Sequence, residues 1–386
     1  MALYGPSQPL RKEGNRAEAL GALRRLINCR IWPVQTGQSP NEQGTVCKIA
    51  RRRLEEFMNI EHLAMRLIEG DRRALAQAIT LVESGRADHR VQAIELMERV
   101  QSAGREALRL GLSGTPGVGK STFIESFGMM LVHEGLKVAV LAVDPSSART
   151  GGSILGDKTR MELLTREKNA FIRPSPSQTE LGGVARRTRE ATLLCEAAGY
   201  DVVLIETVGV GQSETVVAQM SDLFLLLLAP AGGDELQGVK RGIMEMADLI
   251  LVNKADGDLE AAAQRTRADY AGALHLLRKR PQDPQGFPKA TTVSALQDKG
   301  LVEAWADIKQ LVAWRKEHGY LAKTRMEQAQ YWFAQDIRNG LLRQLETEPL
   351  KTAIAEYAKR VEQGEITASR AAAQVLAALK ATTGQI

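Results

Sequence analysis

The nine residues from Gly114 to Thr122 read Gly-Thr-Pro-Gly-Val-Gly-Lys-Ser-Thr, and the rest of the chain is organised around them. They match the phosphate-binding pattern G-x-x-x-x-G-K-[ST] at every specified position. The leucine-rich residues 108–112 before them predict a strand, and residues 122–133 after them predict a helix. This is the strand–loop–helix setting in which backbone N–H groups and the dipole of the following helix converge on one anion.

The loop therefore predicts a nucleotide site with a defined chemistry. Lys120 would reach the outer phosphates, and the Ser121 hydroxyl would bind Mg²⁺. The residues that we expect to contact nucleotide here are Gly114, Thr115, Pro116, Gly117, Val118, Gly119, Lys120, Ser121 and Thr122.

The composition indicates a globular protein in a reducing compartment. The 386 residues are 44% hydrophobic and 25% charged, which is ordinary for a folded domain with smaller attachments. The longest apolar run, Leu223 to Pro230, is too short to cross a bilayer. The three cysteines are scattered without disulfide or metal-site spacing. We therefore expect a cytoplasmic protein with no membrane contact.

The basic charge of the chain lies in its first segment. Residues 1–57 hold ten Lys or Arg and five Asp or Glu, so the remaining residues carry 41 of each sign. A neutral body does not predict nucleic-acid binding. Residues 1–57 lack the apolar stretch of a signal peptide, and their acids argue against a transit peptide. We expect a disordered extension, or residues upstream of a natural start at Met58.

From residue 108 to 317, predicted strands alternate with predicted helices. Continuous apolar strands and βα alternation indicate an α/β fold with a doubly wound, mostly parallel sheet, covered by helices on both faces. The predicted strands are 108–112, 137–143, 171–173, 202–205, 223–228, 249–252 and 291–293. The predicted helices are 155–167, 184–198, 235–246, 258–278 and 299–317.

Helical segments flank this domain on both sides. We divide the chain into a helical extension at 58–105, a nucleotide-binding domain at 106–320 and a helical arm at 321–386. In the extension, Asp71 after Gly70 and Asp88 after Gly85 are predicted helix caps. Two apolar stripes mark the arm; they comprise Met326, Phe333, Ile337, Leu341 and Leu345, and Ala372, Val375, Leu376 and Leu379. These stripes pack either on the domain or on a second subunit.

A carboxylate and a glycine follow the strand at 202–205. Glu206 stands at the tip of this apolar strand, where nucleotide hydrolases hold Mg²⁺ directly or through water. Gly209 then allows the backbone to approach the terminal phosphate. On its own a strand-end acid is more often a helix cap.

The sequence Asn253-Lys254-Ala255-Asp256 follows the strand at 249–252 and matches the N-K-x-D element of guanine-nucleotide proteins. One carboxylate, that of Asp256, can accept from both N1–H and N2–H₂ of guanine, whereas adenine presents no such pair of donors. Asn253 would tie the loops together, and the Lys254 stem would cover the base. A backbone N–H of Ser294 or Ala295 would donate to guanine O6. The order of these motifs favours GTP over ATP.

Residues 144–160 lie between the phosphate loop and Glu206 and are rich in glycine and hydrogen-bonding side chains. This composition is typical of a switch segment that phosphate and Mg²⁺ put in order. Asp144 and Asp157 are candidates to bind Mg²⁺ or position water; taken alone, they would more simply belong to turns and caps.

Five segments give the chain a specific resemblance. They are VDPSSARTGGSILGDKTRM at 143–161, FIRPSPSQTELGGVARRTRE at 171–190, DVVLIETVGVGQSE at 201–214, GGDELQGVKRGI at 232–243 and VNKAD at 252–256. In these segments the chain resembles the MeaB-type GTPases that associate with methylmalonyl-CoA mutase. The resemblance runs from Asn59 to the C-terminus, with Gly233 where an alanine is common in the family.

The resemblance implies a P-loop GTPase of the signal-recognition, MinD and BioD (SIMIBI) class, with an N-terminal helical extension and a C-terminal dimerisation arm. It implies a homodimeric, GTP-dependent chaperone that gates cofactor loading of adenosylcobalamin-dependent methylmalonyl-CoA mutase and protects that mutase. Cobalamin adenosyltransferase is a second candidate partner. GTP or GDP is the implied ligand and Mg²⁺ the implied cofactor.

Residue roles also follow from the resemblance. Ser121, Asp157 and Glu206 would bind Mg²⁺, and the groups at the catalytic centre would be Lys120, Asp144, Asp157 and Glu206. Residues 232–241 would form a third switch, with Asp234, Glu235, Gln237 and Lys240 as its nucleotide-responsive side chains. No residue is an obvious catalytic base, which predicts slow hydrolysis accelerated by a partner.

Two alternatives are less favoured by the residues, and two others stay open. A nickel-delivery GTPase would need clustered soft or imidazole ligands, but the five histidines are dispersed. A kinase would use ATP, against the N-K-x-D element. A chaperone of a related acyl-CoA mutase, or a binding module that hardly hydrolyses GTP, stays open.

Overall fold

The computed structural model describes residues 59–143, 161–174, 181–207, 213–230, 241–277 and 279–383 of the chain. Seven parallel strands form one sheet in the order β3-β2-β4-β1-β5-β6-β7. Their bounds are β1 Leu108–Gly114, β2 Val138–Val143, β3 Ala170–Arg173, β4 Val202–Thr207, β5 Leu223–Leu228, β6 Leu249–Val252 and β7 Lys289–Thr292. The predicted α/β class with a parallel sheet is confirmed.

Several strands, among them β2, β5 and β6, are apolar throughout because both of their faces pack against a core. Along β5, Leu223, Leu225 and Leu227 belong to one buried cluster, while the alternating residues Phe224, Leu226 and Leu228 belong to another. Side chains alternate between the two faces of a strand, so a sheet that is covered on both faces needs apolar residues at every position.

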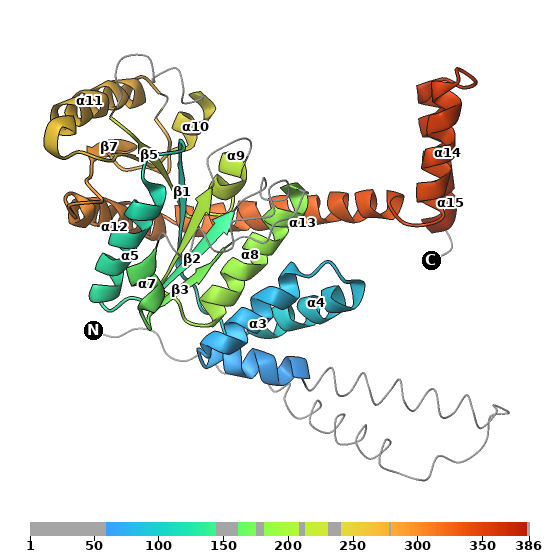
Figure 1. The fold of residues 1–386 in the computed structure, drawn as a ribbon, viewed down its shortest axis with the longest axis horizontal. Helices are drawn as coiled ribbons and strands as arrows, with labels where there is room; N and C mark the ends of the chain where they lie inside the picture. Colours follow the sequence, from blue (N-terminus) through green and yellow to red (C-terminus); the bar gives the residue numbers. More distant parts are fainter. Residues whose placement is uncertain are drawn as a thin grey trace, which may run out of the picture.

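Helices cover both faces of the sheet (Figure 1). One core is closed by α5 (Lys120–His133), α7 (Glu162–Arg166) and α12 (Leu301–Glu317). The other core is closed by α8 (Leu181–Ala197), α9 (Ser213–Ala218), α10 (Arg241–Met246) and α11 (Glu260–Leu276), the last preceded by the 3₁₀ turn η3 (Gly257–Leu259). The short α9 is absent from the predicted helices.

The N-terminal helical unit packs against α8. It consists of a helical stretch at 59–68, α3 (Arg72–Glu83) and α4 (Ala87–Gln101). Asp71 caps α3 as predicted, because its carboxylate accepts from the N–H groups of Arg73 and Ala74. The predicted cap at Asp88 is wrong: the N-cap residue of α4 is Arg86, and the Asp88 carboxylate pairs with the Arg86 guanidinium instead.

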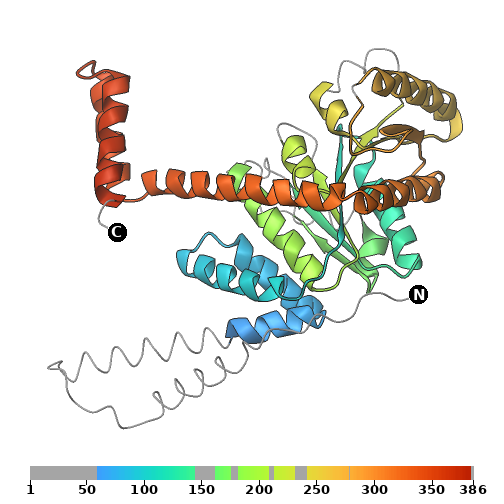
Figure 2. The same ribbon diagram turned by 180° about the vertical axis from the view of Figure 1, so that it is seen from behind.

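The C-terminal residues form three helices, α13 (Tyr320–Leu345), α14 (Leu350–Glu362) and α15 (Ala368–Thr383). Figures 1 and 2 show α13 crossing the domain and continuing beyond it to the paired α14 and α15. The predicted apolar stripe lies on α13 and faces solvent, with 58% of Met326 and 68% of Phe333 exposed. Two ways to bury this stripe were expected, packing on the domain or packing on a second subunit. In the single chain the stripe does not pack on the domain.

Among the described residues, no helix combines the length and the apolar character that crossing a membrane requires.

Candidate nucleotide site

The phosphate loop joins β1 to α5 at the centre of the sheet, where β1 lies between β4 and β5. Gly119 has φ +91°, a left-handed conformation, and a Cβ there would lie 2.7 Å from Asn253 Nδ2. A Cβ on Gly114 would lie 2.5 Å from the carbonyl oxygen of Leu227. Both positions thus require glycine: Gly119 for its backbone conformation and for the close approach of Asn253, and Gly114 for the close approach of strand β5.

Lys120 is only 8% exposed and is folded back over its own loop. Its Nζ donates to the carbonyl oxygens of Gly114 at 2.7 Å and Thr115 at 3.2 Å. Burial lowers the pKa of the Lys120 ammonium, and the carboxylates of Glu206 and Glu214 oppose that shift. The lysine thus lies beside the loop that would hold the phosphates, with two carboxylates near enough to act on its charge.

Glu206 is buried near the carboxyl end of β4. It lies opposite Leu112 of β1 and Ala142 of β2, so it stands directly beside the strand that leads into the phosphate loop. The next residue, Thr207, donates through its hydroxyl to Ser113 Oγ at 3.0 Å, which fixes the ends of the two strands together.

The N-K-x-D loop is bonded directly to the phosphate loop. Asn253 Nδ2 donates to the Val118 carbonyl at 3.0 Å, and Asn253 Oδ1 accepts from the Ala295 N–H at 3.1 Å. Lys254, at φ +59°, donates through Nζ to the Gly117 carbonyl at 2.8 Å. Asn253 thus joins three loops, the arrangement that the sequence motif predicts.

Asp256 is partly exposed at the edge of this loop, and Ser294 Oγ donates to its Oδ2. The amides that were expected to recognise guanine O6 already have acceptors inside the protein. The Ser294 N–H donates to the Lys299 carbonyl at 2.9 Å, and the Ala295 N–H donates to Asn253. Their role toward guanine stays a prediction that requires one of these bonds to change partner.

Seven predicted site residues lie outside the described residues: Asp144, Asp157, Gly209, Asp234, Glu235, Gln237 and Lys240. The structure brings together the remaining ones, namely the phosphate loop with Lys120 and Ser121, Glu206 and the base-side residues Asn253, Lys254, Asp256, Ser294 and Ala295.

Glu214 is a residue that the sequence reasoning left without a role. It is buried in the first turn of α9, and its charge acts on Lys120. The signal was an acid at the start of a helix directly after the Gly-rich residues 209–211, but six residues of helix are too few to read from periodicity.

The oxygen donors present fit the predicted Mg²⁺. Ser121 is the second residue of α5, half-buried beside Lys120, and Glu206 supplies a buried carboxylate one strand away. Mg²⁺ prefers a hydroxyl and one or two carboxylates together with phosphate oxygens and water. The remaining predicted ligand, Asp157, lies outside the described residues.

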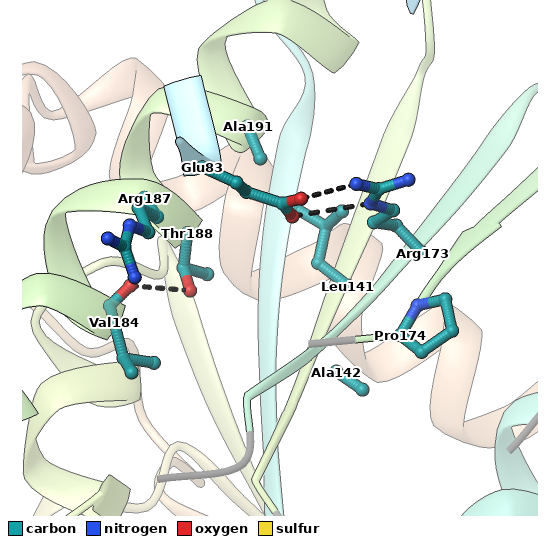
Figure 3. A pocket seen from close by; sticks show the side chains of 9 residues that line it. All are labelled: Glu83, Leu141, Ala142, Arg173, Pro174, Val184, Arg187, Thr188 and Ala191. Atoms are coloured by element: carbon teal, nitrogen blue, oxygen red, sulfur yellow. Dashed lines mark hydrogen bonds and ion pairs between the residues drawn. The ribbon is translucent and has the colours of Figure 1, made fainter. Parts of the chain in front are cut away.

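A separate small cavity of about 20 Å³ lies at the tips of β2 and β3 (Figure 3). Above it, Arg173 at the end of β3 forms an ion pair with Glu83 of α3, and its Nη2 donates to Thr80 Oγ1 at 3.2 Å. These contacts attach the N-terminal unit to the carboxyl end of the outermost strand β3.

Within the described residues there is no cluster of three His, Cys, Asp or Glu side chains that could hold a metal ion. Cys195 is fully buried in α8, and burial raises the pKa of its thiol. A buried neutral thiol does not suit metal transfer.

The parallel sheet, the phosphate loop after β1 and the N-K-x-D loop after β6 define a P-loop protein of the GTPase class. A family model described as "Methylmalonyl Co-A mutase-associated GTPase MeaB" matches residues 75–383. The chain belongs to this family, which confirms the resemblance and the expectation that the chain is a GTPase.

Individual relatives agree with this assignment. The chain is 54% identical over 322 residues to a putative GTPase of Caulobacter vibrioides, covering 83% of this chain and 98% of the relative. It is 48% identical over 332 residues to the mitochondrial methylmalonic aciduria type A homolog of Mus musculus, covering 83% of this chain and 80% of that protein. A crystal structure described as an LAO/AO transport system kinase is 39% identical, with a TM-score of 0.66, and the match covers 84% of this chain and 98% of that one.

Proposed function

We propose that the protein is a GTP-hydrolysing chaperone of an adenosylcobalamin-dependent methylmalonyl-CoA mutase, gating cofactor loading and protecting the mutase from inactivation. The observation that carries this proposal is the family match over residues 75–383. The name of the mouse relative, which refers to methylmalonic aciduria, supports the same metabolic setting. We place the activity in the cytoplasm.

In this proposal, different residues of the site bind the base and the phosphates. Asp256 selects guanine, while Asn253 and Lys254 couple the base loop to the phosphate loop through Val118 and Gly117. Lys120 exchanges the carbonyls of its own loop for the outer phosphates of GTP. Mg²⁺, held by Ser121 and Glu206, would neutralise phosphate charge. Asp144, Asp157 and Gly209 complete the phosphate side of this proposal.

The proposal includes a partner-responsive segment and a homodimer. Lys240, with Asp234, Glu235 and Gln237, would change contacts between the GTP and GDP states and signal them to the mutase. The exposed stripe on α13 would be covered by a second copy of the chain. A cobalamin adenosyltransferase would be a further partner in cofactor transfer.

The deciding experiment is a GTPase assay with and without purified methylmalonyl-CoA mutase, in its apo and cofactor-loaded forms. The mutase should raise a slow basal rate, and Lys240→Ala should lower the stimulated rate toward the basal rate. Isobutyryl-CoA and ethylmalonyl-CoA mutases serve as comparison partners. If none of the three mutases changes the rate or co-elutes with the protein, the chaperone proposal is wrong.

Nickel delivery, which the dispersed histidines disfavour, would give a different experimental result. Equilibrium dialysis with Ni²⁺ would then give a stoichiometric site whose affinity depends on the bound nucleotide. The buried thiol of Cys195 argues against this function.

A further inference from the structure

Three side chains on one face of α13, near its start, form hydrogen bonds with the residues that follow α9. Arg325, Gln328 and Trp332 lie three and four residues apart, so they share one face of the helix. Gln328 Nε2 donates to the Ser221 carbonyl at 2.8 Å, and Trp332 Nε1 donates to the Gln219 carbonyl at 3.2 Å.

Arg325 adds a charged anchor beside these two bonds. Its Nε and Nη2 donate to the two carboxylate oxygens of Asp222 at 2.8 and 2.7 Å, and Nη2 also donates to the Ala107 carbonyl at 2.7 Å. Asp222 precedes β5 and Ala107 precedes β1. The polar face of α13 is therefore bonded to Ala107, just before β1, and to residues 219–222, which follow α9 and lead into β5.

Trp332 is held in a fixed orientation. Its side chain is 7% exposed, and the Arg189 guanidinium of α8 lies 5.5 Å from its ring centroid. Arg189 is itself tied to α13, since its Nη2 donates to Asp336 Oδ2 at 2.6 Å. The indole N–H thus reaches Gln219 from a ring that is supported on its other side.

At its other end, α9 reaches the nucleotide site. This six-residue helix begins at Ser213, shortly after Glu206 and the predicted phosphate-contacting Gly209, and its first turn carries the buried Glu214. A Cβ on Gly111 of β1 would lie 2.8 Å from Val217 Cγ1, so α9 is packed tightly beneath the strand that leads to the phosphate loop. A helix this short is not stable alone and takes its position from such contacts.

We propose that Trp332 and Gln328 are positioning residues for GTP hydrolysis, holding α9 so that the buried Glu214 in its first turn keeps its place near the phosphate loop. Among the described residues, the hydrogen bonds of these two side chains go to Ser221 and Gln219 and not to the phosphate loop or the N-K-x-D loop. The base-side bonds of Asn253 and Lys254 do not involve α9. The bonds of Gln328 and Trp332 therefore act on the terminal-phosphate side of the site. Their loss should slow the hydrolysis of GTP and leave the affinity for GDP unchanged.

The test compares Trp332→Phe and Gln328→Met with the full-length protein, using basal hydrolysis without any partner. Trp332→Phe keeps the ring under Arg189 and removes the N–H bond to Gln219. If the full contribution of one neutral hydrogen bond is lost from the transition state, kcat falls about fivefold. In the double variant, kcat should fall about 25-fold. The Kd for GDP should stay within about twofold.

Trp314→Phe is the matched control. Trp314 lies on α12, and its buried Nε1 has no hydrogen-bond partner among the described residues, so this exchange removes a Trp without removing such a bond. Hydrogen exchange at residues 213–222 is the second readout. Trp332→Phe should increase exchange there and leave β1 and β4 protected, whereas Trp314→Phe should leave residues 213–222 unchanged.

Two results would overturn the proposal. One is a kcat for Trp332→Phe and Gln328→Met that matches the Trp314→Phe control. The other is a GDP affinity that falls in step with kcat, since that would make the bonds general supports of the fold. If Trp332→Phe does not fold, Gln328→Met decides by the same measures.

Discussion

Replacing Asn253 with alanine should uncouple the base loop from the phosphate loop. Asn253 is 2% exposed and makes two buried bonds, to the Val118 carbonyl at 3.0 Å and from the Ala295 N–H at 3.1 Å. Removing the side chain leaves both backbone groups without these partners. At about 1.4 kcal/mol for each bond, the loss is about 2.8 kcal/mol, which corresponds to a fall in affinity of about 100-fold.

Isothermal titration calorimetry with GDP and with a non-hydrolysable GTP analogue measures this effect. Both Kd values should rise by about 100-fold, because neither bond involves the terminal phosphate. Asn253→Asp serves as the matched variant, since it keeps an acceptor for the Ala295 N–H and loses the donor to Val118. Affinities within about threefold of wild type, or a loss confined to the GTP analogue, would refute the reasoning.

Four further outcomes test other parts of the structure. Lys120→Ala should abolish tight binding of a labelled GTP analogue, because the outer phosphates lose the point charge of the loop; unchanged affinity would contradict the phosphate-loop assignment. Asp256→Asn should shift binding from guanine toward xanthine nucleotides, since an amide can donate to the 2-oxo group of xanthine; retained GTP selectivity would refute base recognition by Asp256. Burial raises the pKa of Tyr200 to about 12, so its contribution to stability should be present below about pH 10 and lost between pH 10 and 12; Tyr200→Phe should lose less stability over that range, as followed by urea unfolding. A chain ending at Ala322 should be less stable than one ending at Gly340 by about 3 kcal/mol or more, since removing Arg325 leaves the buried Asp222 carboxylate without its ion pair; equal melting temperatures would contradict this.

The sheet could be predicted from the sequence because several of its strands are continuous apolar runs. The boundaries of β5 and β6 coincide with the predicted runs at 223–228 and 249–252, since a strand buried on both faces is apolar at every position. The short α9 left no such signal, because one and a half turns cannot establish a helical period.

The site was predictable where a motif specifies chemistry and unpredictable where the fold supplies the partner. The N-K-x-D element predicts that Asn253 ties loops together. Its partner Val118 lies 135 residues away in the chain, so only the fold identifies it. The same limit applies to the predicted O6 donor at Ala295, whose N–H turned out to serve Asn253.

The helical caps illustrate a second limit. Asp71 and Asp88 both come shortly after a glycine, yet only Asp71 caps a helix. Asp71 directly precedes α3, so its carboxylate reaches the N–H groups of Arg73 and Ala74. Asp88 is the second residue of α4, so it lies past the N-cap position, which Arg86 occupies, and its carboxylate forms an ion pair with Arg86.

The two faces of α13 have different surroundings. The predicted boundary falls at the first residues of this helix, but Arg325, Gln328 and Trp332 bind it to the sheet and to α9. The exposed Phe333 lies next to Trp332 in sequence, about 100° around the same helix, and belongs to the apolar stripe. A partner that displaced α13 by binding its apolar stripe would therefore also disturb the bonds of Gln328 and Trp332 to residues 219 and 221. The helix that extends away from the GTPase domain is thus also bonded to the residues that follow α9, whose first turn carries the buried Glu214 near the phosphate loop.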